Sequence, residues 1–375
     1  MTEIYLIRHA QAEGNLYRMM QGHWDGDVTE LGKKQIDALA LRFKDIHIDA
    51  LYTSDLYRTR LTASAITRFH DIPMNTTPLF REINVGPWET LFFGNVFHEE
   101  NEQAEFFIHD PEKWHVEGAE TYAQVADRAY PALEELAKKH DGQAVVVVSH
   151  GVTIRCLLSK ITGIGLSETE RLPICRNTAV SKVRWENGAF TAEYLNDYSH
   201  IIPLGDSSWT KTGDLRHEPF NPASDRTWYE DCYADAWLSA HGNLEGFSPA
   251  PYYDAALLHH RENNGAVLRI YLGDKIIGLL DMDTRRGEHA GYGWISLIYL
   301  APDYRAKGYG IQILARALSL YSAMGRNALR LHVAEENKAA LAFYKKYGFE
   351  VLSAENGGAG RLLLMEKKLG RRQDV

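Results

Sequence analysis

The sequence predicts a two-domain protein of the α/β class. Through Asn196, short apolar strands alternate with amphipathic helices, a pattern typical of a layered fold with a largely parallel sheet. From about Ser199 to Ala223 no period is sustained, and Gly, Ser and Pro become frequent, as in connecting segments. A new pattern of helices and strands starts at Ser224. With 375 residues, the chain is long enough to build two separate hydrophobic cores.

The first predicted domain spans residues 1–200, and local periodicity predicts each of its elements. Apolar strands alternate with amphipathic helices, and a hairpin with an Asn187-Gly188 turn closes the domain. We expect strands at residues 4–7, 50–53 and 144–149, helices at 31–44, 58–70 and 122–140, and hairpin strands at 180–185 and 190–195.

The second predicted domain spans residues 224–370, and a linker at residues 201–223 precedes it. Its helices and strands follow one another in a mixed order, which indicates an α/β domain of ordinary size. We expect a helix up to about residue 240, strands at 267–272, 275–282 and 294–300, a helix at 311–324 and a strand at 329–333.

Composition and charge argue against several classes of protein. The formal net charge is −9; residues 1–200 carry 20 Lys and Arg against 29 Asp and Glu, and residues 201–375 carry 21 of each. Neither half has the basic excess of a nucleic-acid-binding domain. No apolar run is long enough to cross a bilayer, and a strand starts directly after Met1, so we expect no membrane span, no signal peptide and a cytoplasmic location. The cysteines form no CxxC pair and are expected to be reduced: Cys156, Cys175 and Cys232.

Polar residues stand at the ends of two predicted strands in the first domain. Arg8 and His9 follow the first strand, and His150 follows the third one. Because ligands of open α/β sheets bind at the carboxyl ends of strands, these side chains are predicted to converge. A single histidine is more often a surface or hydrogen-bonded residue, but two at strand ends beside an arginine indicate a site. Arg58 starts a helix between them, and Glu82 follows it.

Taken in order along the chain, these motifs resemble the histidine phosphatase superfamily, which is also called phosphoglycerate mutase-like. The resemblance covers about residues 1–198 and implies a three-layer α/β/α fold. Ala10 and Gln11 stand where the family usually has Gly and Glu, and neither change removes a catalytic group. The resemblance rests on Arg8-His9, Asn15, the segment from Gln21 to Gly32, Arg58, Glu82 and Ser149-His150-Gly151.

The chemistry of these residues suits phosphoryl transfer. A neutral imidazole nitrogen is a competent nucleophile toward phosphorus, so His9 is expected to form a phosphohistidine. Cationic and N–H donors stabilise the phosphoryl oxygens, which stay negatively charged through the transition state. Glu82 is expected to protonate the leaving alkoxide and then to activate water, without a metal. The implied phosphate-binding residues are Arg8, Asn15, Arg58, His150 and Gly151.

Two alternative interpretations of this domain have less support. The mutase branch typically follows its acid with Arg-His-Tyr-Gly, whereas Glu82 is followed by INVG, which favours a phosphatase over mutase-type phosphotransfer. A metal site is not expected, because His98, His109 and His115 have no compact ligand spacing. The aromatic stretch at residues 92–115 is instead expected to form a solvated helix and a cover over the phosphate site.

A glycine-containing turn precedes an apolar helix in the second domain. The motif RAKGYG at residues 305–310 follows an apolar strand, and glycines at such a turn let backbone N–H groups approach a pyrophosphate. The motif is neither a P-loop nor a Rossmann fingerprint. Together with Asn337 and the run AFYKKYGF at residues 342–349, it resembles the GNAT acetyltransferase superfamily over residues 224–369.

This second resemblance implies a mixed α/β GNAT fold with acetyl-CoA as co-substrate. Backbone groups of Ile298 and Leu300 would pair with pantetheine as an added strand does. Tyr344 would protonate the departing thiolate, with Tyr347 as the alternative acid. The other implied cofactor-binding residues are Arg305, Lys307, Gly308, Tyr309 and Gly310 at the pyrophosphate and Asn337 at the pantetheine arm.

The predicted protein is therefore bifunctional, with small-molecule partners. The first domain would hydrolyse a phosphomonoester, and the second would transfer acetyl from acetyl-CoA to an amine, with one phosphorylated amino metabolite as an economical common substrate. In the alternative, the second domain senses an acyl-CoA and regulates the phosphatase. No motif encodes the substrates or the oligomeric state. The base that deprotonates the amine stays open among Asp281, Asp283, Glu288 and His289.

Overall fold

The computed structural model describes residues 1–205, 213–357 and 360–369. Backbone contacts divide these into two compact units: the first contains residues 1–205, and the second contains residues 213–357 and 360–369. Residues 206–212 of the predicted linker, and residue 370 at the predicted end of the second domain, lie outside the described residues. The exact domain boundaries therefore stay predictions.

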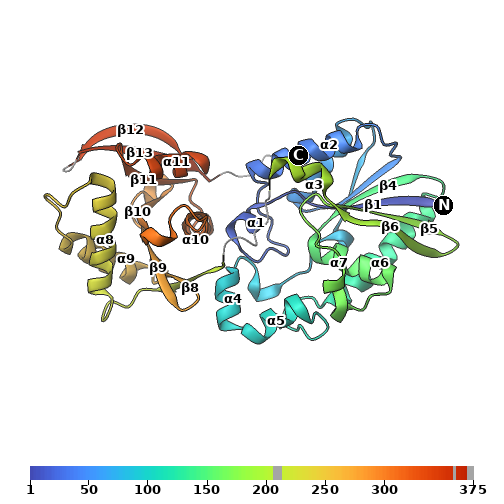
Figure 1. Cartoon of the computed structure of the whole chain (residues 1–375), viewed down its shortest axis with the longest axis horizontal. Helices are drawn as coiled ribbons and strands as arrows, with labels where there is room; N and C mark the ends of the chain where they lie inside the picture. Colours follow the sequence, from blue (N-terminus) through green and yellow to red (C-terminus); the bar gives the residue numbers. More distant parts are fainter. Residues whose placement is uncertain (206–212, 358–359, 370–375) are drawn as a thin grey trace. The chain divides into compact units, whose positions relative to one another are not determined.

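A six-stranded sheet forms the centre of the first unit (Figure 1). Its strand order is β3-β2-β4-β1-β5-β6. The first four strands in this order are parallel, and β5 and β6 add an antiparallel hairpin beside β1. The strands are β1 (Thr2–Arg8), β2 (Ala50–Ser54), β3 (Met74–Thr77), β4 (Ala144–Ser149), β5 (Val180–Glu186) and β6 (Ala189–Asp197).

Helices cover both faces of this sheet. Successive residues of a strand point to opposite faces, so Ile4 and Leu6 of β1 enter one core, and Tyr5 and Ile7 enter another. The first core is closed by α6 and α7, and the second by α2 and α3 (Figure 1). This arrangement confirms the predicted three-layer α/β/α fold. The helices are α1 (Glu13–Tyr17), α2 (Glu30–Phe43), α3 (Tyr57–Thr67), α4 (Phe93–Glu99), α5 (Asn101–His109), α6 (Tyr122–Lys139) and α7 (Gly151–Thr162).

The aromatic stretch at residues 92–115 was expected to cover the phosphate site, but part of it is buried in a core of its own. It forms α4 and α5, but its largest ring, Trp114, is 1% exposed and packs in a third core. The Trp114 ring centroid lies 5.6 Å from that of Trp88 and 5.0 Å from that of Phe107. Because Ile83 and Val85 belong to the same core, this cluster anchors the segment that follows the predicted acid.

The second unit is built on a seven-stranded sheet with the order β12-β13-β11-β10-β9-β8-β7 (Figure 1). Only β10 and β11 are parallel neighbours; every other pair in the described sheet is antiparallel. The strands are β7 (Leu215–Pro219), β8 (Val267–Leu272), β9 (Lys275–Asp283), β10 (Tyr292–Leu300), β11 (Ala328–Ala334), β12 (Glu350–Gly357) and β13 (Gly360–Lys368).

Strand β7 lies within the range that the sequence indicated as a linker. It pairs with β8 along its whole length, and the side chain of Gln312 accepts a hydrogen bond from the Leu215 N–H at 2.9 Å. A five-residue edge strand ending at Pro219 is too short to give a clear period, which explains why its sequence resembles a connecting segment.

The helices of the second unit also cover both faces of their sheet. Leu279 of β9 packs with α8 (Arg226–His241) and α9 (Ala250–Glu262). Its neighbour Gly278 faces the other way, where an added Cβ would lie 3.4 Å from Ile313 of α10 (Gly310–Ala323). The N-terminal end of α10 packs closely on α11 (Lys338–Lys346), since a Cβ at Gly310 would lie 2.9 Å from the Phe343 ring.

A buried ion pair joins α9 to β9. The Nδ1 group of His259 lies 2.7 Å from Oδ1 of Asp281, and the Tyr229 hydroxyl donates to the other Asp281 oxygen at 2.7 Å. Nε2 of His259 lies 3.5 Å from Asp283. Burial by itself would lower the pKa of His259, but its hydrogen bonds to the two aspartates outweigh that effect and raise the pKa to about 9. The imidazole is therefore charged at neutral pH.

The stability of the second unit is expected to fall as the pH rises from 6.5 to 9. The folded-state pKa of His259 lies above the unfolded value of about 6.5, so this stabilisation is complete below pH 6.5 and is lost as the pH passes about 9. Its size is about 3 kcal/mol. Urea unfolding of the second unit, measured against pH, should show this loss in the wild type and in the exposed control His289→Gln. The loss should be absent in His259→Gln, and a flat wild-type profile would contradict the expectation.

Candidate active sites

Two histidine rings meet at the carboxyl ends of β1 and β4. These strands are parallel neighbours with Arg8 opposite Ser149, so the next residue of each strand, His9 and His150, emerges at the same edge. The His9 N–H donates to the Ser149 carbonyl at 2.9 Å. The ring centroids are 5.2 Å apart, and the two residues are 3% and 0% exposed. The structure thus brings together the two histidines that the sequence placed at strand ends.

The protonation state of His9 suits a nucleophile. Its Nδ1–H donates to the Ala10 carbonyl oxygen at 2.7 Å, which leaves the lone pair of Nε2 free in the neutral ring. Burial lowers the pKa of His9 and of His150 well below the ordinary value, and the positive charges of Arg58 and Arg8 lower both further. Both imidazoles are therefore neutral at pH 7.

Two arginines supply positive charge to this edge of the sheet. Arg58, in the first turn of α3, is fully buried and donates to the carbonyls of Gly22 at 2.7 Å and Trp24 at 3.0 Å. Arg8 donates through Nη1 to the Cys175 carbonyl at 2.5 Å. Its buried Nε, like both ring nitrogens of His150, has no hydrogen-bond partner among the described residues. Buried polar groups normally have partners, so an anionic ligand would satisfy these groups.

The carboxylate of Glu82 lies at the N-terminus of α7. Its Oε1 accepts from the N–H groups of Val152 and Thr153, both at 3.1 Å. A Cβ added to Gly151 would lie 3.7 Å from Glu82 Oε2 and 3.5 Å from Cζ of Arg8. Oε2 and the guanidinium therefore border the same space beside Gly151, where a proton can pass between the carboxyl group and a bound ligand.

Asn15 is held beside the backbone of His9. Its Oδ1 accepts from the N–H of Ala12 at 3.0 Å and from Nδ2 of Asn177 at 3.2 Å. The same Asn177 nitrogen donates to the His9 carbonyl at 3.0 Å. With its oxygen engaged, Asn15 presents its amide N–H groups as the remaining donors.

Three residues that organise this site had no recognisable pattern in the sequence: Glu89, Arg128 and Asn177. Glu89 accepts from the N–H groups of Gly22, His23 and Trp24, the loop whose carbonyls hold Arg58. Arg128 of α6 donates to the carbonyl of Glu82 at 2.9 Å and pairs with Glu120 at 2.8 Å. Such residues act through contacts between distant segments, and no local spacing indicates them.

The second candidate site lies where β10 and β11 part. Their parallel pairing ends at Ile295 opposite Leu331, whereas β10 continues to pair with β9 as far as Leu300. A register shift on β10 between Ile295 and Leu297 marks the point of separation. Ile298 and Leu300 thus lie on a stretch that pairs with β9 alone in the described sheet, and its other edge suits an added strand.

The predicted pyrophosphate turn connects β10 to α10. Gly308 has a φ of +90° and Ala306 a φ of +58°, so the turn uses backbone conformations that glycine favours. Tyr309 caps α10 and Gly310 is its first residue, which leaves the first N–H groups of the helix for an anion. The Arg305 side chain pairs with Asp235 of α8 and donates to the Leu300 carbonyl, so it anchors the turn. The side chain of Lys307 lies 5.9 Å from the centre of the Tyr304 ring.

Tyr344 and Asn337 have surroundings that the sequence did not indicate. Tyr344 packs between Phe343 and Phe349, and burial raises the pKa of its hydroxyl above the ordinary value near 10, so it is a weaker acid than expected. Oδ1 of Asn337 accepts from the N–H of Ala340 at 3.1 Å and caps α11. Only its amide nitrogen remains for a pantetheine arm.

Three of the four candidates for the base that deprotonates the amine already have hydrogen-bond or ion-pair partners. Asp281 is 1% exposed and already pairs with His259 and Tyr229. Asp283 accepts from backbone N–H groups in the following turn, and Glu288 pairs with Arg326 at 3.3 Å.

Across residues 1–205, 213–357 and 360–369, no group of three or more His, Cys, Asp or Glu is placed to hold a metal ion, and no helix is long and apolar enough to cross a membrane.

The chain joins a histidine phosphatase domain to a GNAT acetyltransferase domain. The chain belongs to the histidine phosphatase superfamily (branch 1), whose sequence model matches residues 4–198. Residues 226–349 match the model of the acetyltransferase (GNAT) family, members of which use acetyl-CoA. Both families imply small-molecule substrates.

Known proteins resemble the first unit. The chain is 33% identical over 201 residues to phosphoserine phosphatase 1 of Hydrogenobacter thermophilus, and the match covers 54% of this chain and 95% of that protein. It is 30% identical over 206 residues to the probable phosphoglycerate mutase GpmB of Escherichia coli O1:K1, with coverage of 54% and 95%. The solved structure of Bacillus stearothermophilus YhfR superposes with a TM-score of 0.52 at 28% identity, covering 54% of this chain and all of YhfR. The matches span about half of this chain.

Proposed function

We propose that the first unit hydrolyses phosphomonoesters through a phosphohistidine intermediate on His9. The observation that carries the proposal is the free Nε2 lone pair of a neutral His9. Its ring centroid lies 5.2 Å from that of His150, which is buried and whose ring nitrogens lack partners among the described residues. A phosphate bound between the two rings would receive hydrogen bonds from His150 and positive charge from Arg8 and Arg58.

The reaction then proceeds in two balanced steps. In the first, His9 Nε2 forms a bond to phosphorus, the bond from phosphorus to the ester oxygen breaks, and the carboxyl proton of Glu82 passes to the leaving alkoxide. In the second, water attacks the phosphohistidine, its proton returns to Glu82, and the bond from phosphorus to nitrogen breaks. Inorganic phosphate leaves, and His9 is neutral again.

Replacement of Glu82 by glutamine is expected to slow the hydrolysis of alkyl phosphates by about 10²- to 10⁴-fold, the range for loss of a general acid. With p-nitrophenyl phosphate the leaving group departs without a proton. The rate at which the Glu82→Gln variant releases nitrophenol in the first turnover should therefore be nearly unchanged. Rapid-quench kinetics on both substrates measure the contrast, and Glu135→Gln, an exposed position of α6, is the matched control. Equal slowing of the first turnover with the alkyl phosphate and with p-nitrophenyl phosphate would argue against proton donation by Glu82.

For the second unit, we propose acetyl transfer from acetyl-CoA to an amine. The open edge of β10 at Ile298 and Leu300 supports a pantetheine arm that pairs as an added strand, and the turn at residues 305–310 supports the pyrophosphate. When bound, acetyl-CoA supplies the activated acetyl group. The chain's own part is to align the thioester with the amine and to give the thiolate a proton from Tyr344.

The Tyr344→Phe variant is expected to lower the rate of thiol release by about tenfold to a hundredfold, a modest loss for a general acid because burial makes this tyrosine a weak one. Acetyl-CoA affinity should stay unchanged, since the ring keeps its packing. Thiol release in the presence of an amine panel, with Tyr347→Phe as the neighbouring control, measures the effect. Full activity in Tyr344→Phe combined with a loss in Tyr347→Phe would move the acid to Tyr347.

Fusion of the two units in one chain supports a shared metabolite. We propose a small phosphorylated amine that loses its phosphate in the first unit and gains an acetyl group in the second. A screen of phosphorylated amines with acetyl-CoA, which measures phosphate and free thiol separately, tests the pairing. If every active compound led to release of phosphate only or of free thiol only, the two units would not share a metabolite.

A further inference from the structure

Asn177 and Thr178, in the loop before β5, hold the backbone of the proposed nucleophile. The Thr178 N–H donates to the Arg8 carbonyl at 3.0 Å. Nδ2 of Asn177 donates to the His9 carbonyl at 3.0 Å and to Oδ1 of Asn15 at 3.2 Å. The placement of three residues of the candidate site therefore depends on this loop.

Thr178 has a backbone conformation that needs support from its neighbours. Its φ is +57°, in the left-handed region that a β-branched residue adopts only with strain. The residue is fully buried, and its hydroxyl donates to the Asn177 carbonyl at 2.8 Å. The hydroxyl oxygen still has lone pairs to accept a hydrogen bond, and the donor comes from outside the loop.

His200, just beyond β6, is that donor. Its Nε2 lies 3.1 Å from the hydroxyl oxygen of Thr178, and its Nδ1 lies 3.2 Å from Nη1 of Arg42. Because a guanidinium can only donate, Nδ1 accepts and the ring proton is on Nε2, which donates to Thr178. Burial and the charge of Arg42 lower the pKa of His200 to about 4, so the ring is neutral and keeps this single proton at pH 7.

Arg42 of α2 fixes the other side of this imidazole. Its Nη2 pairs with Oδ2 of Asp197 at 2.8 Å and donates to the Tyr194 hydroxyl at 3.3 Å. Its Nη1 also donates to the Asp197 carbonyl at 3.2 Å. Arg42, His200 and Thr178 thus form a relay of hydrogen bonds, which runs from α2 and the end of β6 to the loop before β5.

We propose that His200 is a positioning residue of the phosphatase site, which acts on His9 through Thr178. The inference rests on the proposed phosphohistidine chemistry of the first unit, and neither the sequence motifs nor the family matches assign a role to His200. The Nε2–H group keeps Thr178 in its strained conformation, so that the backbone of His9 and the side chain of Asn15 stay in place. A shift of about 1 Å in a reacting group is enough to slow a reaction about a hundredfold.

Two substitutions of His200 separate its two hydrogen bonds. Glutamine places an amide nitrogen near the position of Nε2 and can donate to Thr178, whereas asparagine places its oxygen near Nδ1 and loses that donor. In the full chain, His200→Asn is expected to slow the first-turnover release of nitrophenol from p-nitrophenyl phosphate by about tenfold to a hundredfold. His200→Gln should restore most of the rate. No slowing in His200→Asn, or equal slowing in both variants, would overturn the inference.

A double-mutant cycle tests whether His200 and Thr178 act together. Thr178→Val removes the hydroxyl and keeps the β-branched shape, whereas Thr178→Ser keeps the hydroxyl. We expect Thr178→Val to slow the first turnover at least as much as His200→Asn, and Thr178→Ser to slow it much less. The double variant with Thr178→Val and His200→Asn should be no slower than Thr178→Val alone. Losses that multiply in the double variant would show that the two residues act separately and would overturn the relay.

Two further readouts distinguish positioning from a loss of folding. Rates are compared well below the unfolding midpoint of every variant, where a variant that is merely less stable keeps the wild-type rate. In NMR spectra of the full chain, the amide signal of His9 should shift in His200→Asn and stay near its wild-type position in His200→Gln. Because both variants lack the imidazole, the contrast does not report the loss of the ring itself. An unshifted His9 signal in His200→Asn would contradict the positioning role.

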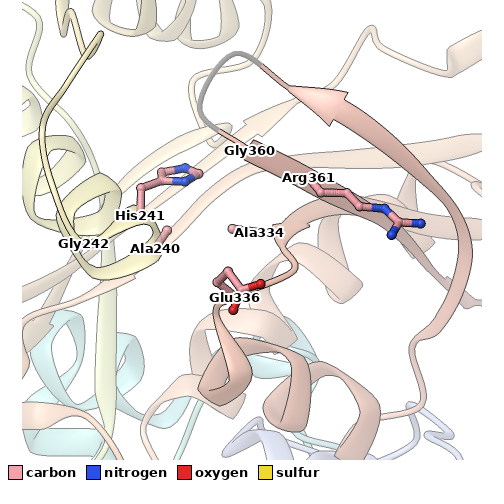
Figure 2. Close-up of a pocket in the computed structure, with 7 residues that line it drawn as sticks. All are labelled: Ala240, His241, Gly242, Ala334, Glu336, Gly360 and Arg361. Atoms are coloured by element: carbon pink, nitrogen blue, oxygen red, sulfur yellow. The ribbon is translucent and has the colours of Figure 1, made fainter.

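Two control variants remove side chains outside the relay. Ile202→Ala changes the same turn as His200 at a position that is 64% exposed. His241→Ala removes an imidazole from the second unit, where Figure 2 shows His241 at a pocket of about 290 Å³ lined by the ends of α8, β11 and β13 and by the adjoining turns. Both controls should keep the wild-type first turnover. A loss in either one equal to that of His200→Asn would overturn the inference.

The wild type in the same experiment distinguishes two kinds of failure. If it forms a phosphohistidine on His9, and His200→Asn does so at the same rate, the positioning role fails and the proposed hydrolysis stands. If the wild type forms no phosphohistidine while the His9 amide signal still responds to His200→Asn, the relay exists but the proposed hydrolysis fails, and the positioning role fails with it.

Discussion

Replacement of His9 by alanine is expected to abolish phosphate release by the first unit and to leave acetyl transfer by the second unchanged. The loss in kcat should be at least about 10⁴-fold, the scale for removal of a covalent nucleophile. His150 cannot substitute for His9. Among the described residues no carbonyl holds a proton on one of its ring nitrogens as Ala10 does for His9, and we propose that its fully buried ring donates to the phosphate.

Two measurements and two control variants make this result specific. Phosphate release reports turnover, and phosphorus NMR of rapidly quenched enzyme should show an acid-labile phosphohistidine in the wild type and none in His9→Ala. His47→Ala, whose side chain is 83% exposed, controls for the loss of an imidazole. The His9→Asn variant keeps much of the side-chain volume, so equal loss in both variants argues against lost packing at this buried position as the cause. Full phosphate release by either variant would contradict the proposed nucleophile.

The same experiment separates a phosphatase from a mutase. A phosphatase passes the phosphoryl group from His9 to water and releases one phosphate for each ester consumed. A mutase returns the group to an organic hydroxyl, so a phosphohistidine would form while isomers accumulated without release of phosphate. The ratio of phosphate to consumed ester decides between the two.

The parts of the site that the sequence predicted are those carried by strand ends. His9 and His150 follow β1 and β4, and once these strands are parallel neighbours, the pleat and register fix where the next residues emerge. Glu89 and Asn177 were missed because they act by holding loops from other segments. Their contribution depends on tertiary contacts, which have no period in the sequence.

In the second unit, the sequence likewise predicted some elements of the fold and missed others. The strand at β10 and the helix at α10 were predicted, because both are markedly apolar. Strand β12 gave no signal, since nearly all of its residues are exposed on both faces, including Val351 and Leu352, and no alternation of polarity results.

Replacement of Gly308 by valine is expected to weaken acetyl-CoA binding by about tenfold to a hundredfold, equivalent to about 1–3 kcal/mol. Gly308 has a φ of +90°, a conformation that a β-branched residue adopts only with strain. Relief of that strain would rotate the turn and move the N–H groups at the start of α10 away from the pyrophosphate. Phosphate release should be unaffected, because His9 belongs to the other unit.

A matched substitution at the other end of the same helix tests whether the turn itself is responsible. Gly325 follows α10, has a φ of +71° and borders open space, so Gly325→Val introduces a similar backbone strain without touching the turn. Calorimetric titration with acetyl-CoA should show weaker binding for Gly308→Val and wild-type affinity for Gly325→Val. Equal losses in both variants would mean that the affinity depends on the general order of α10, and equal retention would mean that the pyrophosphate binds elsewhere. Only the expected asymmetry supports a pyrophosphate site formed by the backbone of the turn.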